Sequence, residues 1–275
     1  MTTDRWPTAD RWLVALDVDG TILHEDETVS PGVRDAVRAV ADAGHEVTLA
    51  TGRSWGSTQP VLESLGLEPE LLVCANGALV MERDATDPTG YRRAHVETFD
   101  PEPVLRLVRE HLPDGRFLVE NPDGFRLYTR GMGDWNLDYA REVEFEEFAG
   151  QLATRVVVVS PDHDDEEFFR IVESMGLHRV SYSVGWTAWL DIAPDGVNKA
   201  TGLERIRERH GVPRDRLFAV GDGRNDIDMF EWAGAEGRAV AMGQAPDEVK
   251  AVATDVTGSV VEDGLAQALS RLLPG

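Results

Sequence analysis

Short apolar runs alternate with amphipathic stretches in the first and last thirds of the chain. The apolar runs cover residues 12–16, 46–51, 71–76, 216–221 and 238–242. The stretches between them carry hydrophobic residues at helical spacing, with residues that favour helix ends at their borders. Nearly continuous apolar strands separated by amphipathic helices are typical of a parallel sheet that is covered on both faces. The pattern therefore predicts an α/β fold with a Rossmann-like parallel-sheet core.

The pattern changes near residue 83. Strands, several of them with alternating polar and apolar residues, are predicted at 91–99, 115–121, 124–130, 153–160 and 178–192. The turn sequence "NPDG" at 121–124 predicts a hairpin between two of them, and helical patterns occupy 101–112 and 164–176. We therefore expect a core domain formed by residues 1–82 and 191–275. A smaller, largely antiparallel α/β domain formed by residues 83–190 is inserted into it.

Polar residues follow the apolar strands of the predicted core. Asp17 and Asp19 end the first strand and Thr51 ends the second, while Asn76 and the run "GDGRND" follow two later ones. In an open parallel sheet, ligands bind outside the carboxyl ends of the strands. We therefore expect one group of side chains at a single edge of the sheet, made of Asp17, Asp19, Thr51, Asn76, Asp222, Asn225 and Asp226.

Four carboxylates at one edge would repel each other unless a cation lay between them. Mg²⁺ prefers oxygen ligands and commonly binds carboxylates together with a substrate phosphate. Lys199 follows the inserted domain at the start of a helix, where its ammonium could bind phosphate oxygens. Gly20 and Gly52 suit tight turns whose backbone N–H groups could face an anion. A carboxylate, Mg²⁺ and a phosphate together indicate phosphoryl transfer through an aspartyl-phosphate.

Composition narrows the possible partners. The 275 residues carry a formal net charge of −23, which disfavours binding to nucleic acids and to anionic membrane surfaces. Cys74 is the only cysteine, so an intramolecular disulfide is impossible and a reducing compartment is expected. The sequence shows neither a signal core nor the ~18 consecutive apolar residues of a membrane span. We therefore expect a soluble, cytoplasmic protein.

Four motifs occur in the order found in the haloacid dehalogenase-like (HAD) superfamily of phosphohydrolases, which the chain resembles. They are "DVDGT" at 17–21, Thr51 in "LATGRS", Lys199 in "GVNKATGL" and "GDGRNDIDM" at 221–229. The insertion resembles the large α/β cap of the Cof-type branch. That branch includes sugar-phosphate phosphatases, mannosyl-3-phosphoglycerate phosphatase and a phosphomannomutase. One departure is Gln244 in "MGQA", where the branch usually has asparagine.

The resemblance implies a role for each matching residue. Asp17 would be the nucleophile, and it would hold Mg²⁺ together with Asp19, Asp222 and Asp226. Asp19 would be the general acid and base, and its backbone carbonyl would help hold the metal. Asp222 would be a further metal ligand, and Asp226 would orient the metal shell or Lys199. Thr51 and Lys199 would hold the transferring phosphoryl group. The phosphate end of the pocket would be lined by Gly52, Arg53, Asn76, Gly77 and Asn225.

The function expected from these features is Mg²⁺-dependent hydrolysis of a small phosphorylated metabolite, with a sugar phosphate favoured, by a monomer or homodimer. A phosphomutase or phosphotransferase acting on sugar phosphates remains an alternative. A receiver-type phosphoacceptor and a catalytically silent binding protein are further ones. Five residues of the inserted domain could contact a sugar or a second anionic group, although packing within that domain is favoured for the tryptophans: Arg126, Arg130, Arg179, Trp186 and Trp189.

Overall fold

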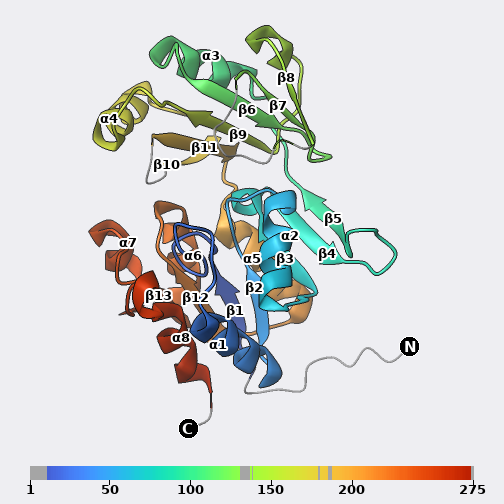
Figure 1. Cartoon of the computed structure of the whole chain (residues 1–275), viewed down its shortest axis with the longest axis vertical. Coiled ribbons are helices and arrows are strands. Elements are labelled where there is room, and N and C mark those ends of the chain that lie inside the picture. The colour runs from blue at the N-terminus through green and yellow to red at the C-terminus, as the bar shows by residue number, and fades with distance from the viewer. Residues whose placement is uncertain (1–10, 131–136, 138, 179, 185–187, 274–275) are drawn as a thin grey trace.

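The computed structural model describes residues 11–130, 137, 139–178, 180–184 and 188–273. Two domains are stacked along the long axis of the molecule, and we call the lower one in Figure 1 the core and the upper one the cap. The core contains a five-stranded parallel sheet with the strand order β14-β13-β12-β1-β2. Its strands are β1 (Leu13–Leu16), β2 (Glu46–Leu49), β12 (Leu217–Gly221), β13 (Arg238–Ala241) and β14 (Asp255–Val256). The predicted α/β fold with a parallel-sheet core is confirmed.

The interior strand β1 is apolar throughout because helices cover both of its faces. Val14 and Leu16 pack toward one set of helices, while Leu13 and Ala15 pack toward the other. The first face is covered by α1 (Pro31–Asp42), α2 (Trp55–Leu65) and α8 (Gly264–Leu269). The second face is covered by α5 (Lys199–His210), α6 (Ile227–Gly234) and α7 (Asp247–Val252).

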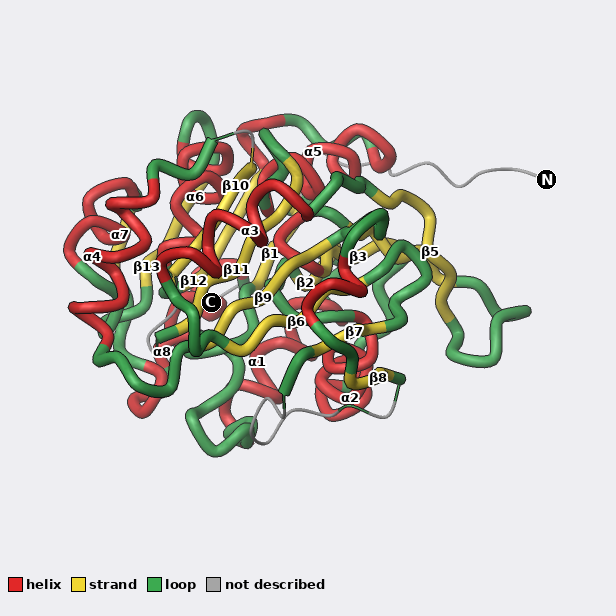
Figure 2. The backbone as a smooth tube through the Cα atoms, turned by 90° about the horizontal axis from the view of Figure 1, so that it is seen from above, coloured by secondary structure: helices red, strands yellow, loops and turns green. Residues whose placement is uncertain are grey.

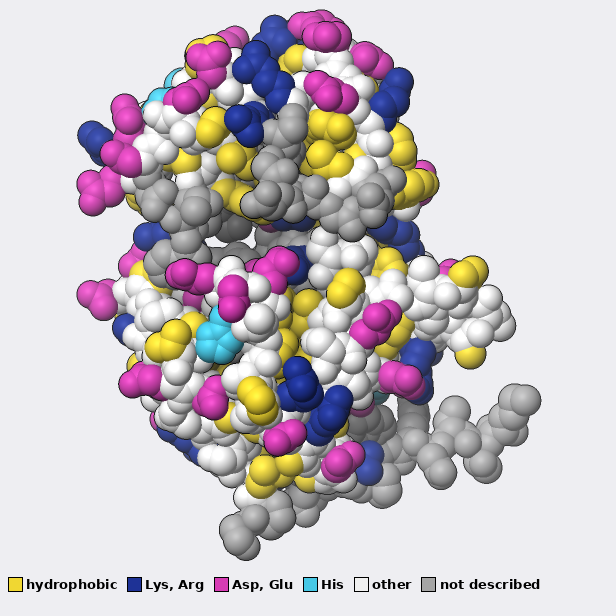
Figure 3. Space-filling model, in the orientation of Figure 1, with side chains coloured by type: hydrophobic (Ala, Val, Ile, Leu, Met, Phe, Trp, Pro, Cys, Tyr) yellow, Lys and Arg dark blue, Asp and Glu magenta, His cyan; other side chains and the backbone are white. Residues whose placement is uncertain are grey.

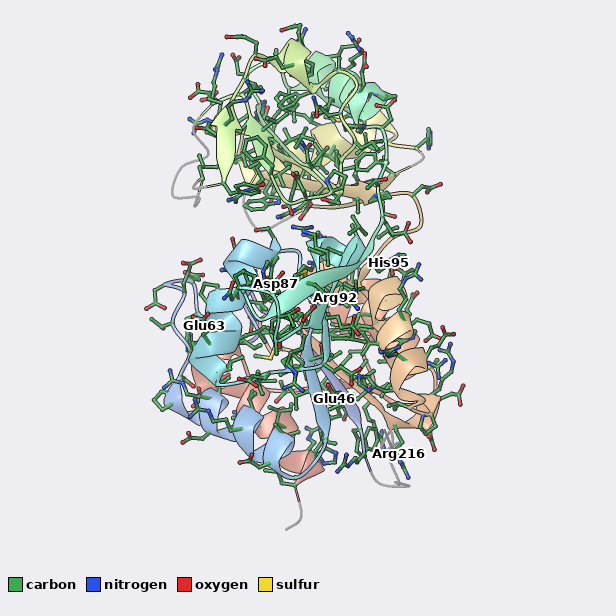
Figure 4. All side chains as sticks on the ribbon, turned by 90° about the vertical axis from the view of Figure 1, so that its right-hand side faces the viewer. Glu46, Glu63, Asp87, Arg92, His95 and Arg216 are labelled. Carbon is green, nitrogen blue, oxygen red and sulfur yellow. The ribbon has the colours of Figure 1, made fainter. Side chains whose placement is uncertain are left out.

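The strand β3 (Leu71–Cys74) lies beside the parallel sheet and is paired with it through one bridge, between Val73 and Ala50. It forms instead an antiparallel sheet with β4 (Leu79–Arg83) and β5 (Tyr91–Val96). Figure 4 faces this sheet and shows His95 of β5 nearer to the cap than Glu46 of β2. The strand β4 was not predicted, and β5 pairs with it although it lies beyond the boundary expected after residue 82.

The cap is built on a six-stranded sheet with the order β10-β11-β9-β6-β7-β8. All neighbours run antiparallel except β7 and β8, which are parallel. The hairpin predicted at "NPDG" joins β6 to β7, whereas β8 was not predicted. The strands are β6 (Arg116–Glu120), β7 (Arg126–Tyr128), β8 (Ala140–Glu142), β9 (Arg155–Val159), β10 (Val180–Val184) and β11 (Trp189–Pro194).

The two faces of the cap sheet have different surroundings. The helices α3 (Glu102–His111) and α4 (Asp165–Met175) pack on one face, against residues such as Phe117 and Val156. Figure 2, seen from above, shows α3 lying over this sheet. The opposite face, which carries Leu118 and Val157, is turned toward the core. In the part of the chain that the structure describes, no helix has the length and apolar character needed to cross a membrane.

Candidate active site

The end of β1 places two aspartates in different environments. The backbone N–H of Asp17 donates to the carbonyl of Val220 (2.9 Å) and so extends the pairing with β12. The Asp17 residue is only 4% exposed, whereas 58% of the Asp19 side chain is accessible to solvent. Gly20 then turns the chain with a φ of 73°, a conformation that side chains other than glycine rarely adopt. One carboxylate is thus buried at the sheet edge and the other lies at the surface above it.

Lys199 joins Asp17 to the loop after β12. Its side chain is 0% exposed, and its Nζ donates to Asp17 Oδ1 (2.6 Å) and to Asp226 Oδ1 (2.7 Å). Lys199 is the first residue of α5, whose N-cap residue Asn198 accepts a hydrogen bond from the backbone of Thr201 (3.0 Å). The hydrogen bond at the N-terminus of α5 therefore fixes the position from which Lys199 extends to the sheet edge.

The second oxygen of Asp226 holds the neighbouring loop. Asp226 Oδ2 accepts the backbone N–H groups of Asp222 and Gly223, each at 2.9 Å. Both oxygens of Asp226 are therefore bonded to groups of the protein. Carboxylate oxygens of Asp17, Asp222 and Asp226 lie within 4.8 Å of one another, and all three residues are buried. The structure thus brings together residues from three of the sequence motifs.

The electrostatics of this cluster favour an additional cation. Burial raises the pKa of Asp17 well above its ordinary value, and the charges of the neighbouring aspartates add to this, although Lys199 opposes it. Burial and the charge of Asp226 raise the pKa of Asp222 to about 7. Burial alone would lower the pKa of Lys199, but its two carboxylate partners outweigh that effect and raise it. Three buried carboxylates with hard oxygen donors and one ammonium fit a divalent cation such as Mg²⁺.

Arg53 holds the exposed carboxylate of Asp19. Its Nη2 donates to Asp19 Oδ1 (2.6 Å) and to Glu27 Oε1 (2.9 Å). The hydroxyl of Thr51, which is fully buried at the end of β2, accepts the backbone N–H of Arg53 (3.0 Å). Gly52 lies between these two residues, next to Asn76. Figure 3 shows acidic side chains gathered along the upper rim of the core, beside an opening between the two domains.

Asn76 connects the core site to the cap. Its Oδ1 accepts from Asn225 Nδ2 (3.0 Å), and its Nδ2 donates to Asp191 Oδ2 on β11 (3.1 Å). Gly77 has a φ of 103°, and a Cβ atom there would collide with the backbone of Asn198. Gly77 therefore allows the close approach of the residue that precedes Lys199.

Two further residues belong to this region although they were not among the expected site residues. Gln244, noted only as a departure from the family pattern, donates through Nε2 to the carbonyl of Gly20 (2.6 Å) and to Asp222 Oδ2 (3.2 Å). Its Oε1 accepts from the backbone of Val260 (3.0 Å). Asp191 accepts a two-point hydrogen bond from Arg155, with Nη2 at 2.8 Å and Nε at 2.9 Å. The only sequence signal for Asp191 is an acidic residue within an otherwise apolar strand.

The candidate contact residues of the cap are spread over different environments. Arg126 is buried in the cap sheet, whereas Arg130 is exposed. Trp189 packs with Leu118 and Val157 on the face turned toward the core. Arg179 and Trp186 lie outside the described residues.

Comparison with known proteins identifies the family. Residues 14–269 match the haloacid dehalogenase-like hydrolase family. The chain is 28% identical over 273 residues to 5-amino-6-(5-phospho-D-ribitylamino)uracil phosphatase YitU of Bacillus subtilis, covering 94% of this chain and 97% of that protein. It is 29% identical over 279 residues to pyridoxal phosphate phosphatase YbhA of Escherichia coli, covering 93% and 96% of the two chains. It also resembles the solved structure of a sugar phosphatase of HAD subclass IIB, with a TM-score of 0.79 at 20% identity over 95% of this chain and 100% of that one. This chain therefore belongs to the haloacid dehalogenase-like hydrolases, among the phosphatases of that family.

Proposed function

We propose that the protein is a Mg²⁺-dependent phosphatase that hydrolyses a small phosphorylated metabolite, in the first place a sugar phosphate, through an aspartyl-phosphate on Asp17. The observation that carries this proposal is the buried Asp17 carboxylate, bonded to Lys199 and close to Asp222. Among the described residues, only Lys199 forms a hydrogen bond with the side chain of Asp17. One carboxylate oxygen is thereby held in place while the other is left for an incoming phosphorus atom.

The chemistry divides between the two aspartates of the first motif. In the first step the Asp17 oxygen bonds to phosphorus, the bond from phosphorus to the leaving oxygen breaks, and Asp19 gives that oxygen a proton. In the second step Asp19 takes a proton from water, the water oxygen bonds to phosphorus, and phosphate leaves Asp17. In the structure Arg53 pairs with Asp19. A bound substrate phosphate would compete with Asp19 for the Arg53 guanidinium. The competition would free Asp19 to carry its proton.

The metal would be held by Asp17, by Asp222 and by the backbone carbonyl of Asp19. When bound, Mg²⁺ supplies positive charge that offsets the phosphoryl oxygens and the carboxylates around them. Asp226, whose two oxygens are engaged by Lys199 and by backbone N–H groups, is better suited to positioning these groups than to direct ligation. Thr51 and Lys199 would bind the transferring phosphoryl group.

The substrate class is supported by the names of the relatives. YitU is named for a ribitylamino-uracil phosphate and YbhA for pyridoxal phosphate, both of which are small phosphate monoesters. Because these relatives are named as phosphatases, transfer to water is favoured over return of the phosphoryl group to a sugar.

The test compares wild-type protein with Asp17→Asn and with Asp247→Asn, a control on the exposed surface of α7. Release of inorganic phosphate from a panel of sugar, polyol and aryl phosphates is measured with Mg²⁺ and with a chelator. We expect Asp17→Asn to abolish release and Asp247→Asn to leave it unchanged. Wild-type protein quenched during turnover of a phosphorus-labelled substrate should carry label that hydroxylamine removes, as an acyl phosphate requires. Substantial turnover by Asp17→Asn would refute the proposal.

A further inference from the structure

A buried ion pair of the cap is in contact with the core. Arg155 of β9 donates through Nη2 to Asp191 Oδ2 (2.8 Å) and through Nε to Asp191 Oδ1 (2.9 Å), and both side chains are buried. Burial alone would lower the pKa of Arg155, but the charge and hydrogen bonds of Asp191 raise it, so the guanidinium stays charged. A buried ion pair is often no more stable than apolar packing of similar size, so stability alone does not account for this one.

The place of Asp191 in the cap sheet lets its carboxylate reach the core. Its neighbours Leu190 and Ile192 pack on the face of the sheet that α3 and α4 cover. Because alternate residues of a strand point to opposite faces, Asp191 points from the cap toward the core (Figure 1). There its Oδ2 also accepts from Asn76 Nδ2 (3.1 Å). One carboxylate oxygen is therefore shared between a cap residue and a core residue.

Asn76 is fixed at this junction by its backbone and its packing. Its backbone N–H donates to the carbonyl of Thr51 (3.0 Å), and its φ of 49° is in the left-handed region, which asparagine tolerates. Its side chain lies beside Gly52, where an added Cβ would be 3.1 Å from Nδ2 and 3.2 Å from Oδ1. Since the two ends of the amide have nearly the same shape, the hydrogen-bond partners decide which end faces Asp191.

The charge of Asp191 sets this orientation. An ionised carboxylate accepts hydrogen bonds and donates none, so Nδ2 of Asn76 must face Asp191. Oδ1 of Asn76 then faces Asn225 and accepts from its Nδ2 (3.0 Å). The oxygen of Asn225 is thereby turned toward Gly223, where an added Cβ would lie 2.5 Å from it. One carboxylate of the cap thus sets the direction of two amides, the second of which belongs to the fourth motif.

We propose that Asp191 is a positioning residue, which acts through Asn76 to keep the Nδ2 group of Asn225 available to the substrate phosphate. This rests on the proposed phosphatase function and on the expected place of Asn225 at the phosphate end of the pocket. Nδ2 of Asn225 carries two hydrogens, of which Asn76 accepts one, while the other has no acceptor among the described residues. A donor suits a phosphate oxygen, whereas a reversed amide would present an oxygen to it.

The central comparison uses two double variants that differ in a single acceptor. The acceptor-free variant, Arg155→Leu/Asp191→Leu, removes the ion pair as a whole, so that neither charge is left buried without the other. The acceptor-restored variant, Arg155→Leu/Asp191→Asn, returns an oxygen on a side chain of similar size. Nuclear magnetic resonance of nitrogen-labelled protein follows the exchange of the Nδ2 hydrogens of Asn76 with solvent. We expect exchange about 10-fold faster or more in the acceptor-free variant, and within about threefold of wild type in the acceptor-restored one.

Binding of inorganic phosphate, the product of the proposed reaction, is measured by calorimetry with saturating Mg²⁺. The acceptor-free variant should bind phosphate roughly 10- to 100-fold more weakly than wild type, because a hydrogen bond to a charged group is lost. The acceptor-restored variant should stay within about threefold of wild type. The affinity for Mg²⁺ alone should change by less than about twofold, since Asp17 and Asp222 are held by Lys199 and Gln244. A general loosening of the site would weaken Mg²⁺ binding as well.

Two further proteins control for the ion pair and for the route. Arg109→Gln/Glu146→Gln removes an exposed ion pair of 3.0 Å elsewhere in the cap and should leave all three measurements unchanged. In an Asn225→Ala background, the acceptor-free substitutions should weaken phosphate binding by less than about threefold further, because the amide through which they act is gone. Far-ultraviolet circular dichroism of each variant shows whether the fold is retained.

The outcomes separate the role of Asp191 from the proposed function. Unchanged amide exchange or unchanged phosphate affinity in a folded acceptor-free variant would overturn the positioning role. A loss of Mg²⁺ affinity as large as that of phosphate affinity, or an undiminished effect in the Asn225→Ala background, would overturn it too. If the amides and the phosphate affinity respond as expected in a protein that releases no phosphate from any ester, the role of Asp191 stands and the phosphatase proposal fails.

Discussion

Replacing Lys199 by methionine tests whether one ammonium makes the buried carboxylates tolerable. The lysine is fully buried and forms ion pairs of 2.6 and 2.7 Å with Asp17 and Asp226, which are themselves buried. Removing one partner of a buried ion pair typically costs about 3–5 kcal/mol, because the remaining charge is left without compensation. In the absence of Mg²⁺ we therefore expect Lys199→Met to lower the free energy of unfolding of the core by about 3–5 kcal/mol near neutral pH.

The loss should depend on pH in a defined direction. The pKa of Asp17 is already raised in the folded protein, mainly by burial, and removal of Lys199 takes away the charge that opposes this rise. The folded variant then binds a proton that the unfolded chain does not bind, so its stability increases as the pH falls. The expected slope is about 1.4 kcal/mol per pH unit for each such proton, which over about three units is comparable to the whole deficit.

The measurement is urea unfolding in a chelator at about pH 8 and about pH 5, compared with Lys250→Met, which changes the only other lysine of the chain. Lys250 lies on α7, and none of the described ion pairs involves it. A Lys199→Met protein as stable as wild type at the higher pH would refute the reasoning. A deficit of the same size at both pH values would show that lost packing, not charge, is responsible.

Three other substitutions probe the groups that hold the site in place. Gly20→Ala should reduce phosphate release by roughly 100-fold or more and destabilise the core by about 1–2 kcal/mol, because its Cβ would meet the Asp222 carboxylate at a φ of 73°. Gly90→Ala, with a φ of 75° and open space around it, controls for backbone strain alone. Gln244→Ala removes the bonds to Gly20 and Asp222 and should raise the Mg²⁺ concentration for half-maximal activity roughly 5- to 30-fold in a metal titration. Glu204→Gln should lower stability by about 1–2 kcal/mol at pH 7, because hydrogen bonds from Arg207 and then from Trp232 lower the pKa of Glu204 to about 2. As the pH falls from about 4.5 to 2 that contribution disappears, so urea midpoints of wild type and variant should converge.

The sequence predicted best those elements whose residues are compatible with only one position in the fold, such as a strand buried on both faces. The strand β1 was predicted because four consecutive apolar residues, buried on both faces, are typical of the centre of a parallel sheet. The strand β4 was missed because it follows β3 after a turn of only a few residues. In that turn Ala75 and Asn76 adopt positive φ values, which asparagine tolerates but alanine rarely adopts. The sequence therefore marked the end of β3 near Asn76 but gave no sign that a second strand begins three residues later.

The site was predictable in its motif residues and unpredictable in the groups that orient them. Asp17, Lys199 and Asp226 come from distant parts of the chain, but each lies at the end of a core strand or the start of a core helix. The contacts of Gln244 and Asp191 depend on how loops and the cap are placed around that edge. Such placement is set by packing between elements, for which hydropathy along the chain carries no signal.

The acidic edge is stable because each carboxylate is held by a different kind of partner. Asp226 is engaged on both oxygens, Asp19 is held by Arg53, and Asp222 is held by Gln244. Asp17 is bonded through Oδ1 to Lys199, and its other oxygen has no hydrogen-bond donor among the described residues. Asp19, Asp222 and Asp226 each accept hydrogen bonds from neighbouring groups of the protein. These bonds offset the repulsion between the carboxylates. Asp17 and Asp222 each keep one carboxylate oxygen without a hydrogen-bond donor among the described residues. The same contacts that make the negative charge tolerable would therefore leave one oxygen of Asp17, the proposed nucleophile, available for phosphorus.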